Sequence, residues 1–537
     1  MAKFPHSHAA PAIALAIALL LAALLGGCAS LPPGADFPKT VSQAYATPEQ
    51  TTLGRKFADA ARAHDGDSGF RILTQGVDGF LTRAQMIDAA ERSLDLQYFI
   101  FRNDDTGRLL AEALLRAADR GVRVRLLLDD GETETGDEQL AALQAHPQIA
   151  IRIFNPFAYR GHVQVFRFAE FLFSGARLDY RMHNKLFVAD NALALIGGRN
   201  IGDDYFQIDP ETQFGDDDVF AVGPVVRQLS ATFDDYWNSA LAIPAEALGT
   251  ASAPALDAYR RALAEHRRQL KAEGADYARR VASGEPLAGM LDGRLPLVWA
   301  PVRVVCDSPD KSRTEKGEIV GKLMHRAVAD EVAQVQSELL MVSPYLIPGD
   351  EGMALFRELR RRQARVGVLT NSLRSSNVLL AHAGYTRYRL PLLEMGVELY
   401  EVRTRLGTAQ GSGQSKAMTR FGTYALHAKL FVFDRKKLFI GSMNFDQRSM
   451  HLNTEIGLII DSPELAQQTA ARFAAIVQPA NSYRVLLRPD AADGAPRLRW
   501  RTLEDGTLVD YDEEPAQSGW QRFKSDFLSL LPLDREL

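Results

Sequence analysis

The 537-residue sequence predicts an α/β protein of two domains related by a pseudo-twofold axis, each a mixed, largely parallel sheet flanked by helices. Three observations lead to this fold class. A strand–helix–strand pattern occurs in the first half, the same pattern occurs in the second half, and one polar motif is present in both. Corresponding residues of the halves are 244 positions apart, so the repeat is a whole domain.

The strand–helix–strand pattern begins with residues 93–101 (SLDLQYFIF), whose apolar and β-branched content predicts a strand. Residues 105–121 have apolar side chains at helical spacing and end on glycine, and residues 122–130 (VRVRLLLDD) predict a second strand. The second half repeats the pattern over 337–347, 351–364 and 365–372. Such units pair their strands in parallel.

Composition and charge narrow the class of protein. Hydrophobic residues make up 46% and charged residues 24%, which is ordinary for a globular chain with a large core. The net charge is −5, whereas a nucleic-acid-binding protein usually carries a basic surplus that neutralises phosphates. Nucleic acid is therefore not expected as a partner, and the sequence names no protein partner.

The expected domain plan follows from shifts in composition. We expect a leader, a tether, a first domain, an Ala/Arg/Glu-rich helical linker, a second domain and a C-terminal extension. Their ranges are 1–28, 29–69, 70–240, 241–300, 301–485 and 486–537.

The leader contains the apolar run PAIALAIALLLAALLGG followed by Cys28. It resembles a bacterial lipoprotein signal, which implies that Cys28 is lipidated and becomes the N-terminus. Ala29 and Ser30 carry no inner-membrane retention aspartate, which implies the periplasmic face of the outer membrane. An ordinary signal peptide and an uncleaved anchor helix are the alternatives. The only other cysteine is Cys306, so lipidation would leave no intramolecular disulfide.

The repeated motif is H-x-K-(x)4-D-(x)6-G-x-x-N, found as HNKLFVADNALALIGGRN over 183–200 and HAKLFVFDRKKLFIGSMN over 427–444. Two apolar runs flank a turn in each copy, which predicts a β-hairpin. Alternation along a strand places the histidine and the lysine of each copy on one face. A glycine closes the second strand of each hairpin, and an asparagine follows it.

A histidine, a lysine and an asparagine together suit an anion that undergoes nucleophilic attack. Lysine and amide donors stabilise charge on phosphoryl oxygens, one imidazole can attack, and another can protonate the leaving oxygen. Each copy is therefore expected to form half of one active site. A metal site is not expected, because the lysines would repel a cation and no Cys/His cluster offers ligands. No cofactor is expected.

These residues resemble the HKD motif of the phospholipase D superfamily over roughly residues 70–485. The resemblance implies a catalytic set of His183, Lys185, Asp190, His427, Lys429 and Asp434. It also implies phosphate contacts from Asn200, Ser442 and Asn444. We interpret Asp190 and Asp434, which lie at the hairpin turns, as mainly structural. The first copy has Gly198 where the second has Ser442, so the halves are chemically unequal.

The resemblance further implies an acidic residue after each asparagine that orients a catalytic histidine through Nδ1. In the first half Asp216 lies eight residues before Pro224, and in the second half Glu455 lies eight before Pro463. Asp216 is thus expected to orient His183, with Asp218 as the alternative, and Glu455 to orient His427.

Several longer stretches, among them LDLQYFIFRNDDTGRLLAEALLRAADRGVRVRLLLDD and FIGSMNFDQRSMHLNTEIGL, look like the cardiolipin synthases of the C type. The resemblance implies transfer of a phosphatidyl group to phosphatidylglycerol from phosphatidylethanolamine or phosphatidylglycerol. A covalent phosphatidyl-histidine intermediate is expected, with His183 preferred as nucleophile and His427 as acid and base. The alternative is hydrolysis of phospholipid or, less expected, of nucleic acid. A binding module without chemistry is disfavoured, because both copies keep His and Lys.

Other segments have candidate roles around a lipid substrate. Residues 163–173 (VQVFRFAEFLF) and the C-terminal GWQRFKSDFLSLLPL are either membrane-contacting or ordinary packing elements. The Gly/Ser-rich residues 404–420 form either a lid or a plain surface loop. By resemblance, His382, Tyr385 and Arg387 are candidates to line a pocket.

Overall fold

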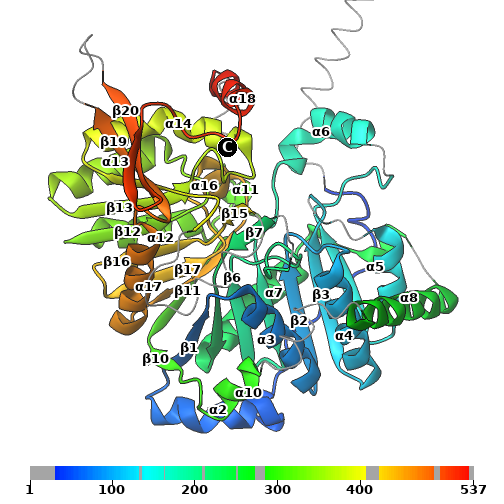
Figure 1. The fold of residues 1–537 in the computed structure, drawn as a ribbon. Coiled ribbons are helices and arrows are strands. Elements are labelled where there is room, and N and C mark those ends of the chain that lie inside the picture. Colours follow the sequence, from blue (N-terminus) through cyan, green and yellow to red (C-terminus); the bar gives the residue numbers. More distant parts are fainter. Residues whose placement is uncertain are drawn as a thin grey trace, which may run out of the picture.

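Two large mixed sheets, each flanked by helices, organise the chain (Figure 1). The structure is a computed structural model that describes residues 31–131, 133, 136–161, 164–208, 212–249, 252–272, 285–406, 423–488 and 496–530. The leader with Cys28 and the greater part of the expected lid over 404–420 lie outside the described residues. Among the described helices, none combines the length and the apolar character needed to cross a bilayer.

The first sheet has the strand order β10-β1-β8-β6-β5-β2-β3-β4-β9. In that order the strands are β10 (Val298–Ala300), β1 (Ser68–Leu73), β8 (Asp218–Val222), β6 (Leu193–Gly197), β5 (Leu186–Ala189), β2 (Ser93–Tyr98), β3 (Arg123–Asp129), β4 (Ile149–Phe154) and β9 (Ala242–Pro244). Its helices are α2 (Thr52–Ala63), α3 (Gly76–Ala89), α4 (Asp105–Asp119), α5 (Asp137–Gln144), α6 (Gln164–Leu178) and α7 (Pro224–Trp237). The short helices η1 (Pro48–Gln50) and η2 (Ala245–Ala247) belong to the same half.

The second sheet has the order β11-β18-β17-β16-β12-β13-β14-β19-β20-β21. These strands are β11 (Val302–Cys306), β18 (Ile456–Ile460), β17 (Lys437–Gly441), β16 (Leu430–Phe433), β12 (Glu338–Val342), β13 (Arg365–Asn371), β14 (Glu398–Val402), β19 (Ser482–Arg488), β20 (Arg497–Glu504) and β21 (Thr507–Tyr511). Its helices are α11 (Lys311–Glu315), α12 (Met324–Gln334), α13 (Gly349–Arg361), α14 (Leu379–Glu394), α16 (Gln447–His451), α17 (Pro463–Ile476) and α18 (Gly519–Ser529). Helices α8 (Ala253–Ala272) and α10 (Pro286–Leu291) lie between the halves in sequence.

Fewer strand pairs are parallel than the sequence predicts. It joins β2 to β3 and β3 to β4 in the first sheet, and β12 to β13 and β13 to β14 in the second. The other pairs within the two large sheets are antiparallel. The sheets are mixed as expected, but "largely parallel" is wrong, because the motif hairpins and edge strands add antiparallel neighbours.

Both predicted motif hairpins are confirmed as β5–β6 and β16–β17. The turn residues Asp190 and Asn191 have φ of 53° and 51°, and Asp434 and Arg435 have φ of 50° and 53°. Two successive left-handed residues are the backbone of a type I′ turn, whose twist matches that of the flanking strands. Each turn therefore fixes the register of the hairpin that follows a motif histidine.

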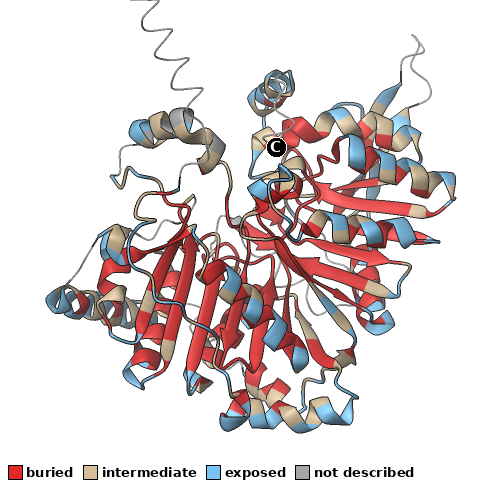
Figure 2. Cartoon of the chain, turned by 180° about the vertical axis from the view of Figure 1, so that it is seen from behind, coloured by how far each residue is buried: buried red, intermediate tan, exposed pale blue. Residues whose placement is uncertain are grey.

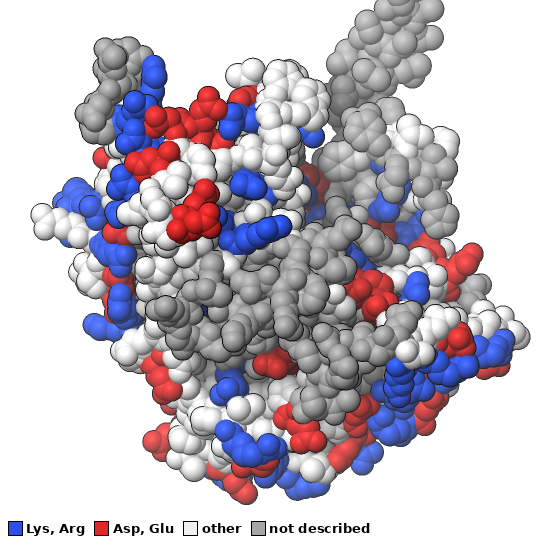
Figure 3. Space-filling model, in the orientation of Figure 1, with Lys and Arg blue, Asp and Glu red and all other residues white. Residues whose placement is uncertain are grey.

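Besides an apolar cluster of its own, each half contributes to a cluster that the two halves share. A continuous buried cluster contains Trp237 from α7, Phe473 from α17, and residues of both large sheets such as Val188 and Ile440. Figure 2 shows the central strands of both sheets buried almost throughout, whereas edge strands such as β20 and β21 are partly exposed. On the face drawn in Figure 3, basic and acidic side chains are interspersed among the described residues rather than gathered in one basic patch.

A small third sheet joins the halves directly. Strand β7 (Thr212–Gly215) of the first half pairs in parallel with β15 (Thr423–Leu426) of the second, so that Gly215 lies opposite Leu426. A parallel bridge between Met182 and Thr454 makes the matching connection from the other half. These two connections lie immediately before the motif histidines His427 and His183, and so they set where the histidines meet the other half.

Candidate active site

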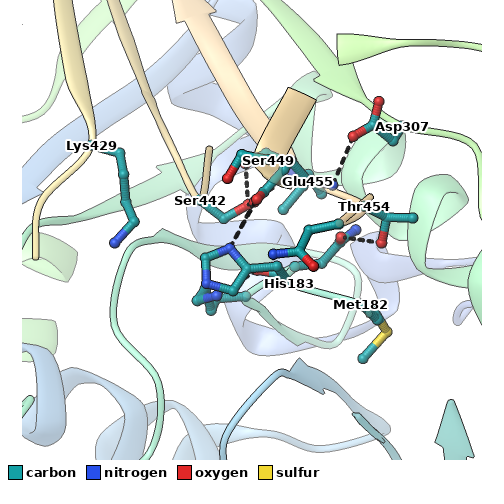
Figure 4. Close-up of polar contacts among 12 residues, drawn as sticks. Met182, His183, Asp307, Lys429, Ser442, Ser449, Thr454 and Glu455 are labelled. Carbon is teal, nitrogen blue, oxygen red and sulfur yellow. Dashed lines mark hydrogen bonds and ion pairs between the residues drawn. The ribbon is translucent and has the colours of Figure 1, made fainter. Parts of the chain in front are cut away.

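The two motif histidines are buried side chains at the junction of the halves, 9% exposed for His183 and 7% for His427. Each one precedes the first strand of its hairpin, β5 or β16. Burial is the main cause that lowers the pKa of each ring, and the charge of the other half's lysine adds to it, Lys429 for His183 and Lys185 for His427. Figure 4 shows Lys429 of the second half drawn beside His183 of the first. The structure thus brings both motif copies into one site.

The acid that holds His183 comes from the second half. Glu455, at the start of β18, lies with Oε1 3.0 Å and Oε2 2.9 Å from Nδ1 of His183 (Figure 4). The backbone N–H of Glu455 donates to Asp307 over 2.9 Å, and Lys311 pairs with that same carboxylate. The sequence signals neither Asp307 nor Lys311, because both lie far from the motif.

The acid that holds His427 comes from the first half. Oδ2 of Asp216 lies 2.5 Å from Nδ1 of His427. The prediction that Asp216 orients His183 and Glu455 orients His427 is therefore wrong in its pairing. Both acids were identified correctly, but each orients the histidine of the opposite half.

The exchange of partners has a simple cause in the backbone. His183 N donates to Thr454 O over 2.9 Å, so the segment carrying Glu455 runs alongside His183. His427 N donates to Gly215 O over 2.9 Å, so the segment carrying Asp216 runs alongside His427. The residue after the paired carbonyl is the acid in both cases, which places each carboxylate beside the ring from the other half.

The alternative orienting residue, Asp218, is committed elsewhere. Its carboxylate pairs with Arg83 at 2.7 Å and with Arg199 at 3.3 Å, and all three side chains are buried. The neighbouring Asp217 pairs with Arg472 of the second half. Strand alternation made Asp218 the second candidate to orient His183, but its carboxylate is paired with two buried arginines that the motif does not reveal.

The two lysines lie close to their own histidines. Nζ of Lys185 donates to the carbonyl of His183, and Nζ of Lys429 donates to the carbonyl of His427. Lys429 also lies 3.0 Å from Nδ1 and 3.2 Å from Nε2 of the His427 ring. Burial lowers the pKa of Lys185 well below its usual value and that of Lys429 to about 8. An anion entering the site would favour the charged form of both.

The two asparagines differ in what they already bind. The amide oxygen of Asn200 accepts from Ile100 N over 3.1 Å, and its amide nitrogen donates to the hydroxyl of Tyr205 over 3.0 Å. The amide oxygen of Asn444 is buried without a hydrogen-bond partner among the described residues. The contacts of Asn200 give it a positioning role, and its expected contact with a phosphate, like that of Asn444, stays a prediction.

Ser442 and Gly198 explain the chemical inequality of the halves. The hydroxyl of Ser442 donates to Oε2 of Glu455 and accepts from Ile456 N over 3.0 Å, so it holds the acid rather than facing open space. A Cβ on Gly198 would lie 2.1 Å from Oδ1 of Asp216. The shorter aspartate sits closer to the backbone and requires glycine, whereas the longer glutamate leaves room for serine.

The electrostatics of the two histidine–acid pairs also differ. Burial, with Lys185 and Lys429, holds the pKa of His183 well below its usual value, and burial with Lys429 lowers that of His427 to about 3. Although burial opposes it, His427 and Lys429 hold the pKa of Asp216 below its usual value. Burial raises the pKa of Glu455 to about 7. Both rings are neutral near pH 7, which is the form in which imidazole can attack phosphorus.

Asp190 and Asp434 lie away from the chemistry. Asp190 accepts from the backbone N–H groups of Glu91, Arg92 and Ser93 at 2.8–2.9 Å. Asp434 accepts in the same way from Gln336, Ser337 and Glu338. Strand β5, four residues and about 13 Å long, lies between Asp190 and the end of the motif that carries His183 and Lys185. Their place in the catalytic set is wrong and the structural interpretation is right, because each ties a hairpin turn to the start of a neighbouring strand.

Three aromatic rings next to the histidines were not anticipated. Phe99 meets the His183 ring edge-on at 5.0 Å, and Tyr205 and Phe214 both lie 5.2 Å from the His427 ring. Phe99 directly follows β2, so its place at the end of a strand was the one available signal. These rings restrict rotation of the imidazoles and exclude water from one side of each.

Of the residues expected around a lipid, His382 and Tyr385 do not line an open pocket. They are buried on α14, where Nε2 of His382 lies 2.7 Å from Glu514 and Tyr385 donates to Glu401 over 3.1 Å. Residues 163–173 lie largely within helix α6, and the side chains of Phe168, Leu172 and Phe173 are outside the described part of the structure. The part of the chain that the structure describes contains no His/Cys/Asp/Glu group suited to hold a metal ion.

The fold and this site define an enzyme of the phospholipase D class with two motif-bearing halves. A family model described as "Cardiolipin synthase, PLD-like domain" matches residues 84–237 and 328–477, one match in each half. Cardiolipin synthase C of Escherichia coli (strain K12) is 37% identical over 477 residues, which cover 88% of this chain and 96% of that protein. The chain therefore belongs to the cardiolipin synthase family with PLD-like domains.

Two further comparisons agree with that membership. An uncharacterized protein of Helicobacter pylori (strain ATCC 700392 / 26695) is 30% identical over 491 residues, covering 91% of this chain and 93% of its own length. The solved structure of phosphatidylserine synthase from Haemophilus influenzae Rd KW20 is 13% identical with a TM-score of 0.50. It covers 79% of this chain and 91% of that one, which shows a shared fold.

Proposed function

We propose that the protein is a phosphatidyltransferase that makes cardiolipin from phosphatidylglycerol and a donor phospholipid, either phosphatidylethanolamine or phosphatidylglycerol. One observation carries the proposal. The duplicated site is complete, with each histidine held at Nδ1 by a carboxylate of the other half. The chain that carries it is 37% identical to a cardiolipin synthase, over 96% of the length of that synthase. A module that had lost its chemistry would not need to keep both pairs.

The first step transfers the phosphatidyl group to the protein. Nε2 of the neutral His183 attacks the phosphorus of the donor lipid and the bond from phosphorus to the headgroup oxygen breaks. For this step His427 has to be imidazolium, a form that the anionic phosphate of a bound lipid favours, and it gives its Nε2 proton to the departing oxygen. We propose His183 as the nucleophile because a lysine crowds the ring of His427 but not that of His183. Lys429 lies 3.0–3.2 Å from both ring nitrogens of His427, whereas Lys185 donates to the backbone carbonyl of His183. The product is a covalent phosphatidyl-His183 intermediate.

The second step passes the group to the acceptor. His427 takes the proton from a glycerol hydroxyl of phosphatidylglycerol, the oxygen attacks phosphorus, and the bond to His183 breaks. Lys185, Lys429 and the amide NH2 group of Asn444 would donate to the phosphoryl oxygens and stabilise their charge. Water in place of the glycerol hydroxyl would give phosphatidic acid, so transfer requires that water be excluded. Hydrolysis of phospholipid is the alternative function.

We also propose that Cys28 is lipidated and anchors the protein at the periplasmic face of the outer membrane of a bacterial cell envelope. The support is the apolar run that ends in LLGGCAS. Cells fed labelled palmitate should give a labelled band for the wild type and none for Cys28→Ser. Label retained by Cys28→Ser would refute lipidation at that residue.

The function is tested with protein lacking residues 1–28 and mixed vesicles of phosphatidylglycerol and phosphatidylethanolamine, with products identified by mass spectrometry. Cardiolipin with free ethanolamine would establish phosphatidylethanolamine as donor, and cardiolipin with glycerol would establish phosphatidylglycerol. Phosphatidic acid alone would make the enzyme a hydrolase. His183→Ala is the control that shows the products depend on this site.

A further inference from the structure

The C-terminal helix α18 exposes a complete apolar face. Trp520, Phe523, Phe527 and Leu530 are 64%, 58%, 58% and 79% exposed. Their spacing of three, four and three residues places them on one side of the helix. An aromatic stripe of this kind is costly to leave in water, so it calls for a partner.

The helix is held firmly in this orientation. Ser518 caps its N-terminus by accepting from Gln521 N, and the Gln521 side chain donates to Leu373 O over 2.8 Å. Arg387 of α14 donates to Ser529 O over 3.1 Å at the other end, and the opposite face, with buried Ser525, packs on α14. The apolar face is therefore outward because the helix is docked, not because it is detached.

The segment before α18 is fixed by a buried ionic cluster. Glu514 pairs with His382 and Arg389 of α14, and Arg389 also pairs with Glu401 of β14 at 2.8 Å. Removing one member of such a cluster would leave buried charge without compensation. The cluster gives His382 a clear role, which is to hold the C-terminal extension in place.

Helix α18 lies at the end of the molecule that carries the site. The helix contacts Leu373, which lies just after β13. At the end of β13, the side chain of Asn371 accepts from Leu426 N over 2.8 Å and donates to Leu426 O over 2.9 Å. Leu426 directly precedes His427. A short chain of contacts thus connects α18 to one catalytic histidine.

Helix α6 flanks the other histidine. It ends at Leu178, five residues before His183, and Asn155 at the end of β4 donates to the carbonyls of Arg177 and Tyr180 over 2.8 Å. The side chains of Val165, Phe166 and Phe171 on α6 are exposed. Figures 1 and 2 both show α6 and α18 at the same end of the molecule.

We propose that the apolar face of α18, assisted by the exposed apolar side chains of α6, is the surface that docks on the lipid bilayer and turns the catalytic end towards it. The inference rests on the proposed function, in which both substrates are bilayer lipids. A bilayer suits this face because aromatic rings on one side of a helix, with basic residues beside them, bind the interface of anionic membranes. Lys524 flanks the stripe and lies 5.9 Å from the Trp520 ring, and Arg522 lies beside it in an ion pair with Glu513.

The experiment compares the turnover of lipids with the same headgroups in two physical forms, as vesicles and as dispersed monomers. The full chain is assayed on vesicles of phosphatidylglycerol and phosphatidylethanolamine, and on the dihexanoyl forms of the same lipids dispersed as monomers. The variant is Trp520→Ser/Phe523→Ser/Phe527→Ser. The control is Val320→Ser/Leu508→Ser, which removes two apolar side chains that are also well exposed, at 104% and 59%, but lie outside α6 and α18.

We expect the ratio of vesicle turnover to monomer turnover to fall about tenfold in the α18 variant and to stay at the wild-type value in the control. Adding Val165→Ser and Phe166→Ser should lower the ratio further. An α18 variant whose ratio equals that of the control would overturn the proposal. So would light scattering that shows a wild-type dimer and a monomeric α18 variant, because the face would then cover a second copy. A wild type that turns over neither form would instead refute the proposed function.

Discussion

Single residues at this site act on histidines that their own half does not contain. Glu455 holds His183 and Asp216 holds His427, so each catalytic ring depends on both halves of the chain. The identity of the acids could be predicted from their spacing to Pro224 and Pro463, but not their partners. Spacing along one chain carries no information on which backbone segments run side by side, and here the contacts at Thr454 and Gly215 decide it.

The same motif position should respond differently in the two halves. Ser442→Ala removes one hydrogen bond to Glu455, which His183 still holds, so we expect kcat to fall about tenfold. Gly198→Ala puts a methyl group 2.1 Å from Oδ1 of Asp216 and displaces it from His427, so kcat should fall on the order of a hundredfold. Both are measured on vesicles, with melting temperatures to confirm folding. Equal losses would contradict the proposed inequality of the halves.

Glu455 should make stability depend on pH in a definite direction. Burial raises its pKa in the folded state to about 7, above the unfolded value near 4.5. Its contribution to stability is present below the unfolded pKa and is lost as the pH rises through about 7. Glu455→Gln has no such titration. The free energy of unfolding of the variant should therefore gain on the order of 2 kcal/mol relative to wild type between pH 5 and pH 8.5.

The measurement is denaturant unfolding of both proteins at the two pH values. The difference between the proteins at a single pH also contains the change in the hydrogen bonds to His183 and Ser442, so only the change with pH is diagnostic. A difference that stays constant from pH 5 to pH 8.5 would show that Glu455 is ionised in the folded state throughout.

Among the elements, the motif hairpins and the strand–helix–strand units could be predicted, because their apolar periodicity is local. The expected strands 93–101 and 122–130 are β2 and β3, and the expected helix 105–121 is α4. Residues 163–173 were ambiguous, because a dense apolar run fits a helix or a strand equally well. The antiparallel edge strands were missed because short strands such as β9 and β10 carry no period of their own.

The hairpin turns should prove to be stability elements. Asp190→Ala would leave the backbone N–H groups of residues 91–93 without their acceptor and would put a residue with a Cβ at a φ of 53° without a stabilising side chain. We expect a loss of about 3 kcal/mol in the free energy of unfolding. Asp434→Ala should cost less, because Asp434 is only half-buried.

Chemical denaturation and a titration of active sites would distinguish the structural from the catalytic interpretation of Asp190 and Asp434. If they are structural, lost activity in Asp190→Ala follows lost folded protein. A full thermal midpoint combined with lost turnover would return Asp190 to the catalytic set.

On the scale of the whole molecule, the two halves form one body around one site. The buried cluster of α7, α17 and both sheets is continuous across them, and Arg448 of the second half pairs with Asp179 of the first at 2.8 Å. The duplication in the sequence predicted a shared site. The depth of the shared core could not be predicted, because apolar residues that face a partner domain look the same as those that face a helix.

This architecture predicts how paired mutants behave. His183→Ala and His427→Ala should each lower turnover at least a thousandfold, since one removes the nucleophile and the other removes the acid and base of both steps. An equimolar mixture of the two variants should remain as inactive as either alone, because every chain builds its single site from its own two halves. The assay is cardiolipin formation on vesicles, with the two variants mixed before and after a cycle of unfolding and refolding. Activity that appears in the mixture, approaching a quarter of wild type per chain, would mean that halves from different chains assemble a site, and the intrachain contacts at Gly215 and Thr454 would then have to form between molecules as well.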